Sequence, residues 1–549
     1  MKTKILIVTI LIFSYCYLGR ENDIFDDEYD YIVIGAGTAG SIVAGKLSDN
    51  PNNKVLLIEE DATNPNIWTT KDWYDHFLGH PDPDISRAFY TPAEPGLNYR
   101  TETLMRAVVT GGCNAHNGMV VIPGDRQLYD GIADATGESQ WSWNNMASHF
   151  SELKSKFYLR HLDDNRVFLS ELKQSIQSIG IPLVSDNFGG SLRGLTNIID
   201  QSKPDPQLGQ RRETTYSNYI DAVLASRSNL QVLIRNRAEK IMFCDNNNST
   251  SSTSDRRACF IRLRDTTTNT IRTIKVGKEL ILSLGAYESP MLLQASGVGD
   301  PAKLSQAGIT PIINSPNVGM RLLDHIYMNY AGKPLLGSIQ SPPQSDWDNR
   351  NTVADGFFLF GAIDANSSTN DYTLATDIQY MWDGKIYFNC AVEMVSPQSE
   401  GEVQVKQVNG NGAAIQPLIE QNYLSARHDV DVLIAAIKEC RRIQSRLVDN
   451  GILDGSKPEF SSTAGDTDQS LEQYVRNTGN GDYHPHASIR MGRADDASAP
   501  LTPRLKVRGT SNVRVIDASS FPIPIRNKIN IPIAILAMQG ADFITQDNN

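Results

Sequence analysis

The chain has 549 residues, and its 51 basic and 63 acidic side chains give a net charge of −12. This length suits two or three folding units, or one large enzyme domain with a second domain inserted into it. A hydrophobic share of 40% with 21% charged residues is ordinary for a globular protein and argues against collagen, coiled coil and disorder. No block of Lys and Arg stands out, so we expect no nucleic-acid partner.

The first predicted element is a short apolar run, Ile5 to Leu18, which two lysines precede. Its 14 residues fall short of the roughly 20 that a membrane span needs. A charged start and a short apolar run are typical of a signal peptide, so we predict one over residues 1–19 and a secreted, extracellular protein without a membrane partner. A membrane anchor or a buried N-terminal strand is the alternative.

Loss of that leader would leave five cysteines, an odd number that rules out full pairing within one chain. They are Cys113, Cys244, Cys259, Cys390 and Cys440. Cys244 and Cys259 flank a polar tract between two alternating apolar segments, so a hairpin would bring them together in a disulfide; two buried thiols are the alternative. Glycosylation sequons begin at Asn247, Asn248 and Asn366, which predicts a glycoprotein if the chain is secreted.

The mature chain opens with a pattern that predicts dinucleotide binding. The apolar run Tyr29 to Ile34 predicts a buried parallel strand, and a glycine turn, a short helix and a second apolar strand, Lys54 to Ile58, follow it. In such a unit the glycines allow a tight turn and close approach of a pyrophosphate, while an acid after the second strand binds a ribose. The expected cofactor residues are Gly35, Gly37, Thr38, Ala39, Gly40 and Glu59. A glycine turn used only for packing is the alternative.

The rest of the chain predicts two interleaved domains. Residues 141–228 and 329–465 mix helical patterns with alternating strands, whereas the C-terminal segment returns to buried apolar runs at 513–516 and 531–538. We therefore predict an α/β protein in which residues 28–145, 229–325 and 466–546 form a cofactor domain. Residues 146–228 and 326–465 would form the second, substrate-binding domain.

Three further segments carry a family resemblance. Residues 285–299 read GAYESPMLLQASGVG, and residues 105–118 read MRAVVTGGCNAHNG. They resemble the second and first signatures of the glucose-methanol-choline (GMC) oxidoreductases, with Thr110 where an aliphatic residue is usual. Residues 484–492 and 512–519 are similar to the family's C-terminal catalytic segment, so the resemblance runs over the whole mature chain.

The resemblance implies a Rossmann-like FAD-binding domain and a discontinuous substrate domain with a six-stranded antiparallel sheet. It also implies oxidation of an alcohol to a carbonyl, in which a base takes the hydroxyl proton and hydride moves to flavin N5. We accordingly expect a secreted FAD-dependent oxidase that reduces oxygen to hydrogen peroxide. The alternatives are a dehydrogenase with a non-oxygen acceptor and a redox-silent, FAD-containing hydroxynitrile lyase, or a mandelonitrile-type cyanohydrin oxidase.

The same resemblance indicates the catalytic residues. His484 matches the family's catalytic histidine, and an imidazole with an unperturbed pKa of about 6.5 can accept a proton at neutral pH. The family's second position, a His or Asn, falls by spacing on Lys528, while a small local shift would present Asn527 or Asn530 instead. His486 could form a metal pair with His484, but no third ligand at suitable spacing is visible, so we expect no metal.

The resemblance also places Arg106, Gly112, His116, Asn117 and Asp517 at the flavin. In family members that oxidise choline and related alcohols, the histidine at the position of His116 carries FAD covalently. A histidine that lines the flavin site without a bond is the alternative.

One departure bears on the substrate. The choline-oxidising relatives place a carboxylate two residues after an Asp-His pair, where it meets the quaternary ammonium. Here Asp324 and His325 are followed by Ile326 and Tyr327. We therefore expect a neutral alcohol as the small-molecule partner, while the oligomeric state stays open.

Overall fold

The computed structural model describes residues 24–61, 85–161, 167–197, 199–206, 209–244, 255–336, 357–364, 367, 369–380, 386–407, 416–459 and 461–548. The predicted signal peptide and the asparagines of all three glycosylation sequons lie outside these residues. They remain predictions.

The first sheet is built around β1 (Ile24–Ile34), the strand predicted before the glycine turn. β1 pairs in parallel with β2 (Val55–Ile58) on one side and with β14 (Ile271–Leu282) on the other. The strand order is β11-β2-β1-β14-β13-β12, and β25 (Val513–Val515) also pairs with β14 in parallel. The remaining strands are β11 (Leu230–Leu233), β12 (Asn236–Cys244) and β13 (Arg257–Asp265).

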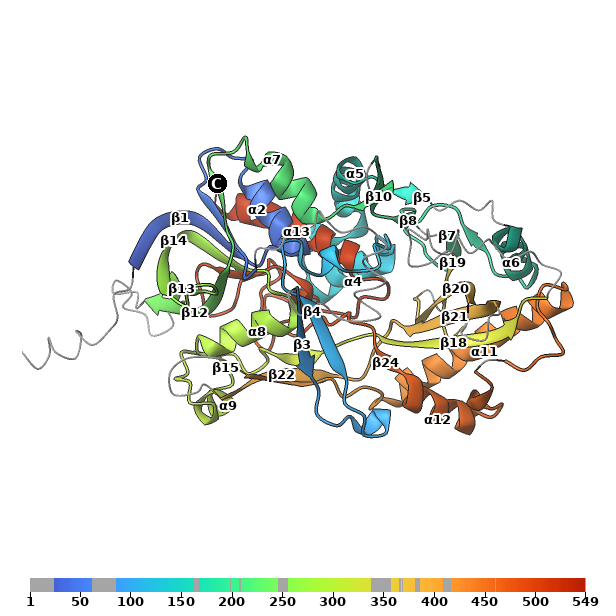
Figure 1. The fold of residues 1–549 in the computed structure, drawn as a ribbon. Coiled ribbons are helices and arrows are strands. Elements are labelled where there is room, and N and C mark those ends of the chain that lie inside the picture. The colour runs from blue at the N-terminus through green and yellow to red at the C-terminus, as the bar shows by residue number, and fades with distance from the viewer. Residues whose placement is uncertain are drawn as a thin grey trace, which may run out of the picture.

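Two helices from opposite ends of the chain cover this sheet. Helix α2 (Thr38–Leu47) follows β1 directly, and the C-terminal helix α13 (Asn530–Asn548) packs beside it (Figure 1). Both are apolar over most of their length, so both are buried between the sheet and neighbouring segments. Parallel strands with a helix after the first strand form the Rossmann-like arrangement that the sequence predicts.

The second sheet has seven strands in the order β24-β18-β21-β20-β19-β7-β6. Their bounds are β24 (Asn480–Gly481), β18 (Ile326–Pro334), β21 (Ile386–Met394), β20 (Tyr372–Tyr380), β19 (Phe357–Gly361), β7 (Gly194–Asn197) and β6 (Leu183–Val184). All neighbours are antiparallel except β6 and β7. The count exceeds the expected six strands by one, and strands of only two residues, β24 and β6, form the two edges.

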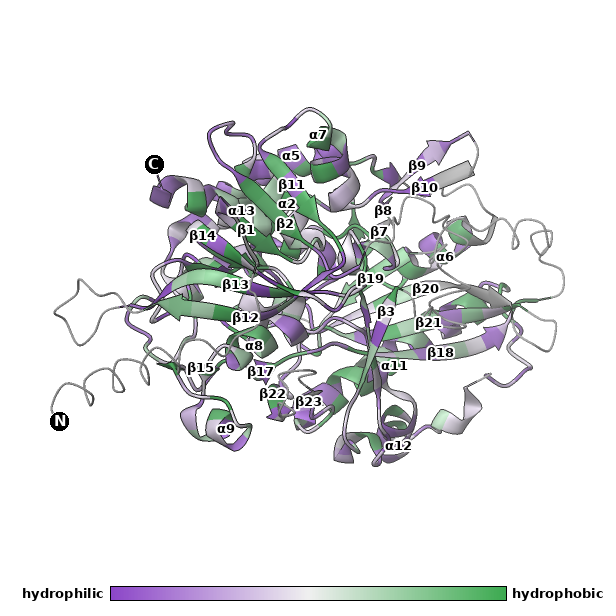
Figure 2. Cartoon of the chain, turned by 60° about the vertical axis from the view of Figure 1, so that its left-hand side comes forward, coloured by the Kyte–Doolittle hydropathy of each residue, from purple (hydrophilic) through white to green (hydrophobic). Residues whose placement is uncertain are grey.

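Helix α11 (Arg427–Asp449) covers one face of the second sheet (Figure 1). Alternate residues of β21, such as Val392 and Met394, pack in the same hydrophobic core as the buried side of this helix. Figure 2 shows hydrophobic colouring along α2 and the strands of the first sheet, as burial on both faces requires. The other face of the second sheet is turned toward a cavity, described below.

The two main hydrophobic cores divide the chain differently from the expected boundaries at several points. Phe150 on α5 (Ala147–Lys156) and Val403 on β22 (Gly401–Gln407) belong to the core of the first sheet, although we assigned both segments to the substrate domain. Leu471 on α12 (Asp468–Thr478) belongs to the core of the second sheet. A local pattern shows that a face is apolar, but it does not show which core that face meets.

Two disulfides are present among the described cysteines. Cys244 and Cys259 pair across the antiparallel strands β12 and β13, as the flanking pattern predicts. Cys390 and Cys440 join β21 to α11, a pair that the sequence analysis did not identify. Cys113 is a free thiol.

The other longer elements are β3 (Ser86–Tyr90), β4 (Thr103–Ala107), α4 (Arg126–Thr136), α6 (Val167–Ser178), α8 (Gly285–Ala295), α9 (Pro301–Gln306) and β23 (Gln416–Glu420). Among the described helices, none is both long enough and apolar enough to cross a membrane.

Candidate active site

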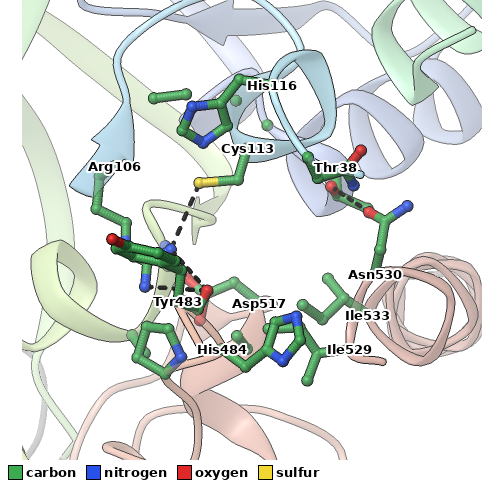
Figure 3. Close-up of a pocket in the computed structure, with 18 of the residues that line it drawn as sticks. Thr38, Arg106, Cys113, His116, Tyr483, His484, Asp517, Ile529, Asn530 and Ile533 are labelled. Carbon is green, nitrogen blue, oxygen red and sulfur yellow. Dashed lines mark hydrogen bonds between the residues drawn. The ribbon is translucent and has the colours of Figure 1, made fainter. Parts of the chain in front are cut away.

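A cavity of about 690 Å³ lies between the first sheet and the open face of the second. Residues from the glycine turn and the 3-10 turn η4 (Gly112–Ala115) line one part of it, and residues of β21 line another. Figure 3 shows His116 and Cys113 on one side of the space, with His484 on the opposite side and Asn530 between them. The cavity therefore brings together the segments that the sequence analysis singled out.

Three glycines at the turn and beside it, Gly35, Gly40 and Gly112, have no room for a side chain. A Cβ on Gly35, whose φ is +97°, would lie 2.5 Å from the carbonyl oxygen of Ser283, and one on Gly40 would lie 1.9 Å from the carbonyl oxygen of Gly35. A Cβ on Gly112 would come within 2.8 Å of the Cα of Gly37. The bare backbone and the N-terminus of α2, at Thr38, therefore face the cavity, which suits a phosphate-bearing ligand.

Glu59 lies where the second predicted strand ends. Its Oε2 accepts a hydrogen bond from the Ala36 amide at 2.8 Å, and its Oε1 accepts one from the Glu60 amide at 2.9 Å. Burial raises the pKa of this carboxyl to about 7, although these two amide donors oppose the shift. The carboxyl lines the cavity and can bind the hydroxyls of a ribose.

Arg106, Cys113 and His116 meet beside η4. Arg106 Nη1 lies 3.5 Å from Cys113 Sγ, and the guanidinium also donates to the carbonyl oxygen of Tyr483 at 3.2 Å (Figure 3). Burial alone would raise the pKa of the Cys113 thiol, but Arg106 and a hydrogen bond with His116 lower it to about 5. Cys113 is therefore a thiolate at neutral pH, and both Cys113 and His116 line the cavity.

Asn117 and Asp517 line the cavity but direct their oxygens at the protein. Asn117 Oδ1 accepts from Arg212 Nη1 at 2.8 Å. Asp517 accepts from the amide of Gly285 at 2.9 Å through Oδ2 and from the amide of Ser519 at 2.8 Å through Oδ1. Asp517 thus holds the start of α8 against the C-terminal segment, and both of its oxygens are already occupied.

His484 lies among charged side chains. Its Nδ1 is 2.9 Å from Asp482 Oδ2, 3.2 Å from Glu393 Oε1 and 3.0 Å from Nδ1 of His325. Burial alone would lower the pKa of His484, but Asp482 and Glu393 raise it to about 9. All the described contacts of the ring use Nδ1, so Nε2 is the nitrogen that remains for a substrate in the cavity.

This environment corrects the expectation that His484 keeps an ordinary pKa. The buried carboxylate of Glu393 and the partly buried carboxylate of Asp482 stabilise the imidazolium, so at neutral pH the ring is largely protonated. The neutral form of His484, which can accept a proton, therefore predominates only at alkaline pH.

Lys528 lies within the same cluster. Its Nζ is 2.7 Å from Glu393 Oε2 and 3.2 Å from Asp482 Oδ2, and these carboxylates raise the lysine pKa despite burial. Lys528 is therefore a cation that balances the carboxylates, and it is not a base. Asn530, at the start of α13, also lines the cavity, and its Oδ1 accepts from Thr38 Oγ1 at 3.0 Å. Asn527 is fully buried, and it is absent from the described lining of the cavity.

Four potential metal ligands converge at this point, although the sequence showed no third ligand at suitable spacing for a metal at His484. One ligand atom from each of His325, Glu393, Asp482 and His484 lies within 4.8 Å of the others. His486 is not part of this group, because its Nδ1 lies 2.9 Å from the carbonyl oxygen of His484 and its Nε2 accepts from the Ile525 amide at 3.2 Å. The ammonium of Lys528 already supplies a positive charge to both carboxylates.

Sequence analysis missed Glu393, Asp482 and His325 as site residues. A signal for Asp482 was available, because residues two apart in an extended segment point to the same side, as Asp482 and His484 do. Glu393 gave no local signal, since it lies on β21, far from His484 in sequence, and reaches His484 only through the tertiary fold. His325 was noted only beside Asp324, whose Oδ1 accepts a hydrogen bond from the His484 amide at 2.8 Å.

Comparison with known proteins assigns the family. Models described as GMC oxidoreductase match residues 29–327 and residues 397–537. The chain therefore belongs to the GMC oxidoreductase family. It is an FAD-binding oxidoreductase that acts on CH–OH donors.

Individual relatives cover nearly the whole chain. Choline oxidase from Arthrobacter globiformis is 26% identical, with 96% of each chain covered. Versicolorin B synthase stcN from Emericella nidulans is 25% identical, with 95% of this chain and 90% of the relative covered. The solved structure of pyridoxine 4-oxidase from Mesorbium loti superposes with a TM-score of 0.80 at 21% identity, covering 94% of this chain and 99% of that one.

The residues of this chain fit an FAD. Gly35, Gly37 and the start of α2 at Thr38 line the cavity with backbone that can approach a pyrophosphate, and the Glu59 carboxyl lies at the end of β2 for an adenosine ribose. Gly112 of η4 and His116, which directly follows η4, line the same cavity as His484, and these residues would hold the flavin ring.

Proposed function

We propose that this protein is a secreted FAD-dependent oxidase that converts a neutral alcohol to a carbonyl and reduces oxygen to hydrogen peroxide. The observation that carries the proposal is the position of His484. Its ring lines the cavity and carboxylates hold its Nδ1, so Nε2 is the nitrogen left for a substrate. That arrangement is suited to a general base, because a fixed Nδ1–H sets the tautomer in which Nε2 accepts a proton.

The chemistry divides between the cofactor and the chain. Bound FAD supplies the hydride acceptor, which no side chain of the protein can replace. His484 accepts the hydroxyl proton of the alcohol at Nε2. Asp482 and Glu393 then stabilise the imidazolium that forms. The ammonium of Lys528 compensates part of the negative charge of these two carboxylates.

A neutral substrate follows from the charges around His484. Glu393 and Asp482 are balanced by Lys528 and by the protonated form of His484. A cationic alcohol would have to compete with Lys528 for the carboxylates, and an anionic one would meet them directly. An uncharged alcohol disturbs neither pairing.

Secretion is supported by the predicted signal peptide together with two disulfides, since such bonds persist in oxidising compartments. Covalent attachment of FAD through His116 is supported by the place of this residue on the cavity wall in the motif that carries the bond in choline-oxidising relatives. We include both in the proposed function.

Replacement of His484 tests the proposal. His484→Ala removes the base, and general-base catalysis contributes about 10²–10⁴-fold to rate. The variant should therefore keep its FAD, and its rate of anaerobic flavin reduction should fall by that factor. Exposed Asn477→Ala, on α12, is a surface control. Near-normal flavin reduction in a folded His484→Ala variant would contradict the assignment.

A further inference from the structure

The open face of the second sheet forms one wall of the cavity, and its composition restricts the substrate. In β21, β18 and β20, alternate residues point into the cavity while the residues between them pack in the core beneath α11. The residues on the cavity side are Tyr327, Asn329, Thr373, Ala375, Asn389, Ala391 and Glu393.

Along β21 these residues form a path that leads away from His484. Glu393 lies at the near end, against His484 and Lys528. The next cavity residue is Ala391, which pairs with Ala375 of β20 and with Asn329 of β18. The small side chains of Ala391 and Ala375 leave space above the middle of the sheet, so a ligand at His484 can extend over them.

Asn389 lies at the far end of this path. It is 6% exposed, and its buried Oδ1 has no hydrogen-bond partner among the described residues. A buried polar atom without a partner is uncommon in folded proteins, because burial removes the water that would otherwise bind it. Within the described part of the chain Oδ1 therefore has no donor, and a ligand in the cavity can provide one.

The separation along the strand sets a scale for this ligand. Asn389 and Glu393 are four residues apart, and a strand rises about 3.3 Å per residue, so their Cα atoms are ~13 Å apart. A ligand that reaches both His484 and Asn389 is consequently an elongated molecule, longer than a simple short alcohol.

We propose that the substrate is an elongated alcohol with a second hydroxyl group remote from the carbon that is oxidised, and that Asn389 binds this second hydroxyl. The inference rests on the proposed function for the identity of the reacting end. Asn389 thus determines specificity for the second hydroxyl group. Ala391 and Ala375 determine the width of the space that the rest of the substrate occupies.

Binding of matched alcohols tests the inference independently of turnover. The probes are straight-chain diols with a hydroxyl at each end and mono-alcohols of the same chain length. They are titrated by calorimetry into holoenzyme whose flavin is already reduced, so that no oxidation accompanies binding. For one range of lengths the diol should bind about tenfold more tightly than its partner, as one hydrogen bond to a buried acceptor predicts.

Two variants of Asn389 separate the hydrogen bond from the shape of the wall. Asn389→Leu removes the acceptor and should abolish the difference in affinity between diol and mono-alcohol. Asn389→Asp keeps an acceptor oxygen and should retain this difference in affinity. Asn477→Leu makes the same replacement on the exposed surface of α12 and should leave the ratio at the wild-type value. An unchanged ratio in Asn389→Leu, or equal affinities at every length in the native enzyme, would overturn the inference.

Ala391→Leu provides a second test if Asn389 variants fail to fold. The larger side chain should block the path, so affinity for long diols should fall at least tenfold relative to short alcohols. Equal losses for both would contradict the proposed path. Failure of the oxidase proposal is distinguishable, because it appears as an unreduced flavin with all alcohols while the diol preference in binding persists.

Discussion

Lys528 Nζ lies 2.7 Å from Glu393 Oε2, which joins the C-terminal segment to the second sheet directly beside His484. The contact places a partly buried cation where the family resemblance leads one to expect a His or Asn. Because Glu393 also contacts His484 through its other oxygen, the charge of Lys528 acts on the pKa of the proposed base.

Replacement of Lys528 by methionine should therefore change both stability and pH dependence. Loss of one partner from a buried charge pair typically costs about 3–5 kcal/mol, so the melting temperature of the holoenzyme should fall. The positive charge of Lys528 lowers the pKa of His484, so its removal should move the pH midpoint of flavin reduction upward.

Lys528→Arg is the matched control for that change, since it keeps the charge and should keep the midpoint near its native value. Thermal denaturation and flavin reduction from pH 6 to 10 give the two readouts. A midpoint that moves to lower pH in Lys528→Met would contradict the electrostatic role.

The pKa of His484 predicts an alkaline pH profile. With a pKa raised to about 9 by Asp482 and Glu393, only the small neutral fraction of His484 can accept a proton at neutral pH. kcat/KM for flavin reduction should rise about tenfold per pH unit and level off near pH 9, because this parameter reports the free enzyme. Stopped-flow measurements under nitrogen check it.

Asp482→Asn tests whether Asp482 raises the pKa of His484. Asp482 is the largest influence that raises the pKa of His484, so its loss should move the plateau to lower pH. A plateau that stays in place would show that another group titrates.

Much of the cofactor half of the site could be predicted because its signals are local. The glycine turn, α2, β2 and Glu59 follow one another along the chain, and the Cys244–Cys259 pair lies on one hairpin. The substrate half could not, because its residues meet only when the second sheet forms. Glu393 and Asn389 resemble many other polar residues of a half-buried strand until their neighbours on β18 and β20 are known.

The same distinction explains why the Cys390–Cys440 bond was not predicted from the sequence. These residues are 50 positions apart, one on a strand and one on a helix, and no spacing rule links such a pair. The raised pKa of His484 likewise depends on which carboxylates the fold brings to it, so residue type alone supported only the ordinary value.

His116 should carry FAD covalently. Acid precipitation of the native protein should leave the yellow colour in the pellet, and His116→Ala should release it to the supernatant. Cys113→Ser is a useful companion, because the Cys113 thiolate is the other nucleophile on this part of the cavity wall. Colour entirely in the supernatant of the native protein would reject the bond. Colour that stays in the pellet for His116→Ala but not for Cys113→Ser would move it to the cysteine.

The central claim is oxidation of an alcohol by hydride transfer, and one measurement tests it most directly. The holoenzyme is mixed with a panel of neutral alcohols under nitrogen while the flavin absorption is followed, and oxygen is then admitted while peroxide is assayed. We predict that an alcohol bleaches the oxidised flavin bands and that oxygen restores them with one peroxide per flavin. Restoration by another electron acceptor but not by oxygen would contradict the oxidase assignment, and release of carbonyl and cyanide from a cyanohydrin without any bleaching would contradict the redox reaction itself.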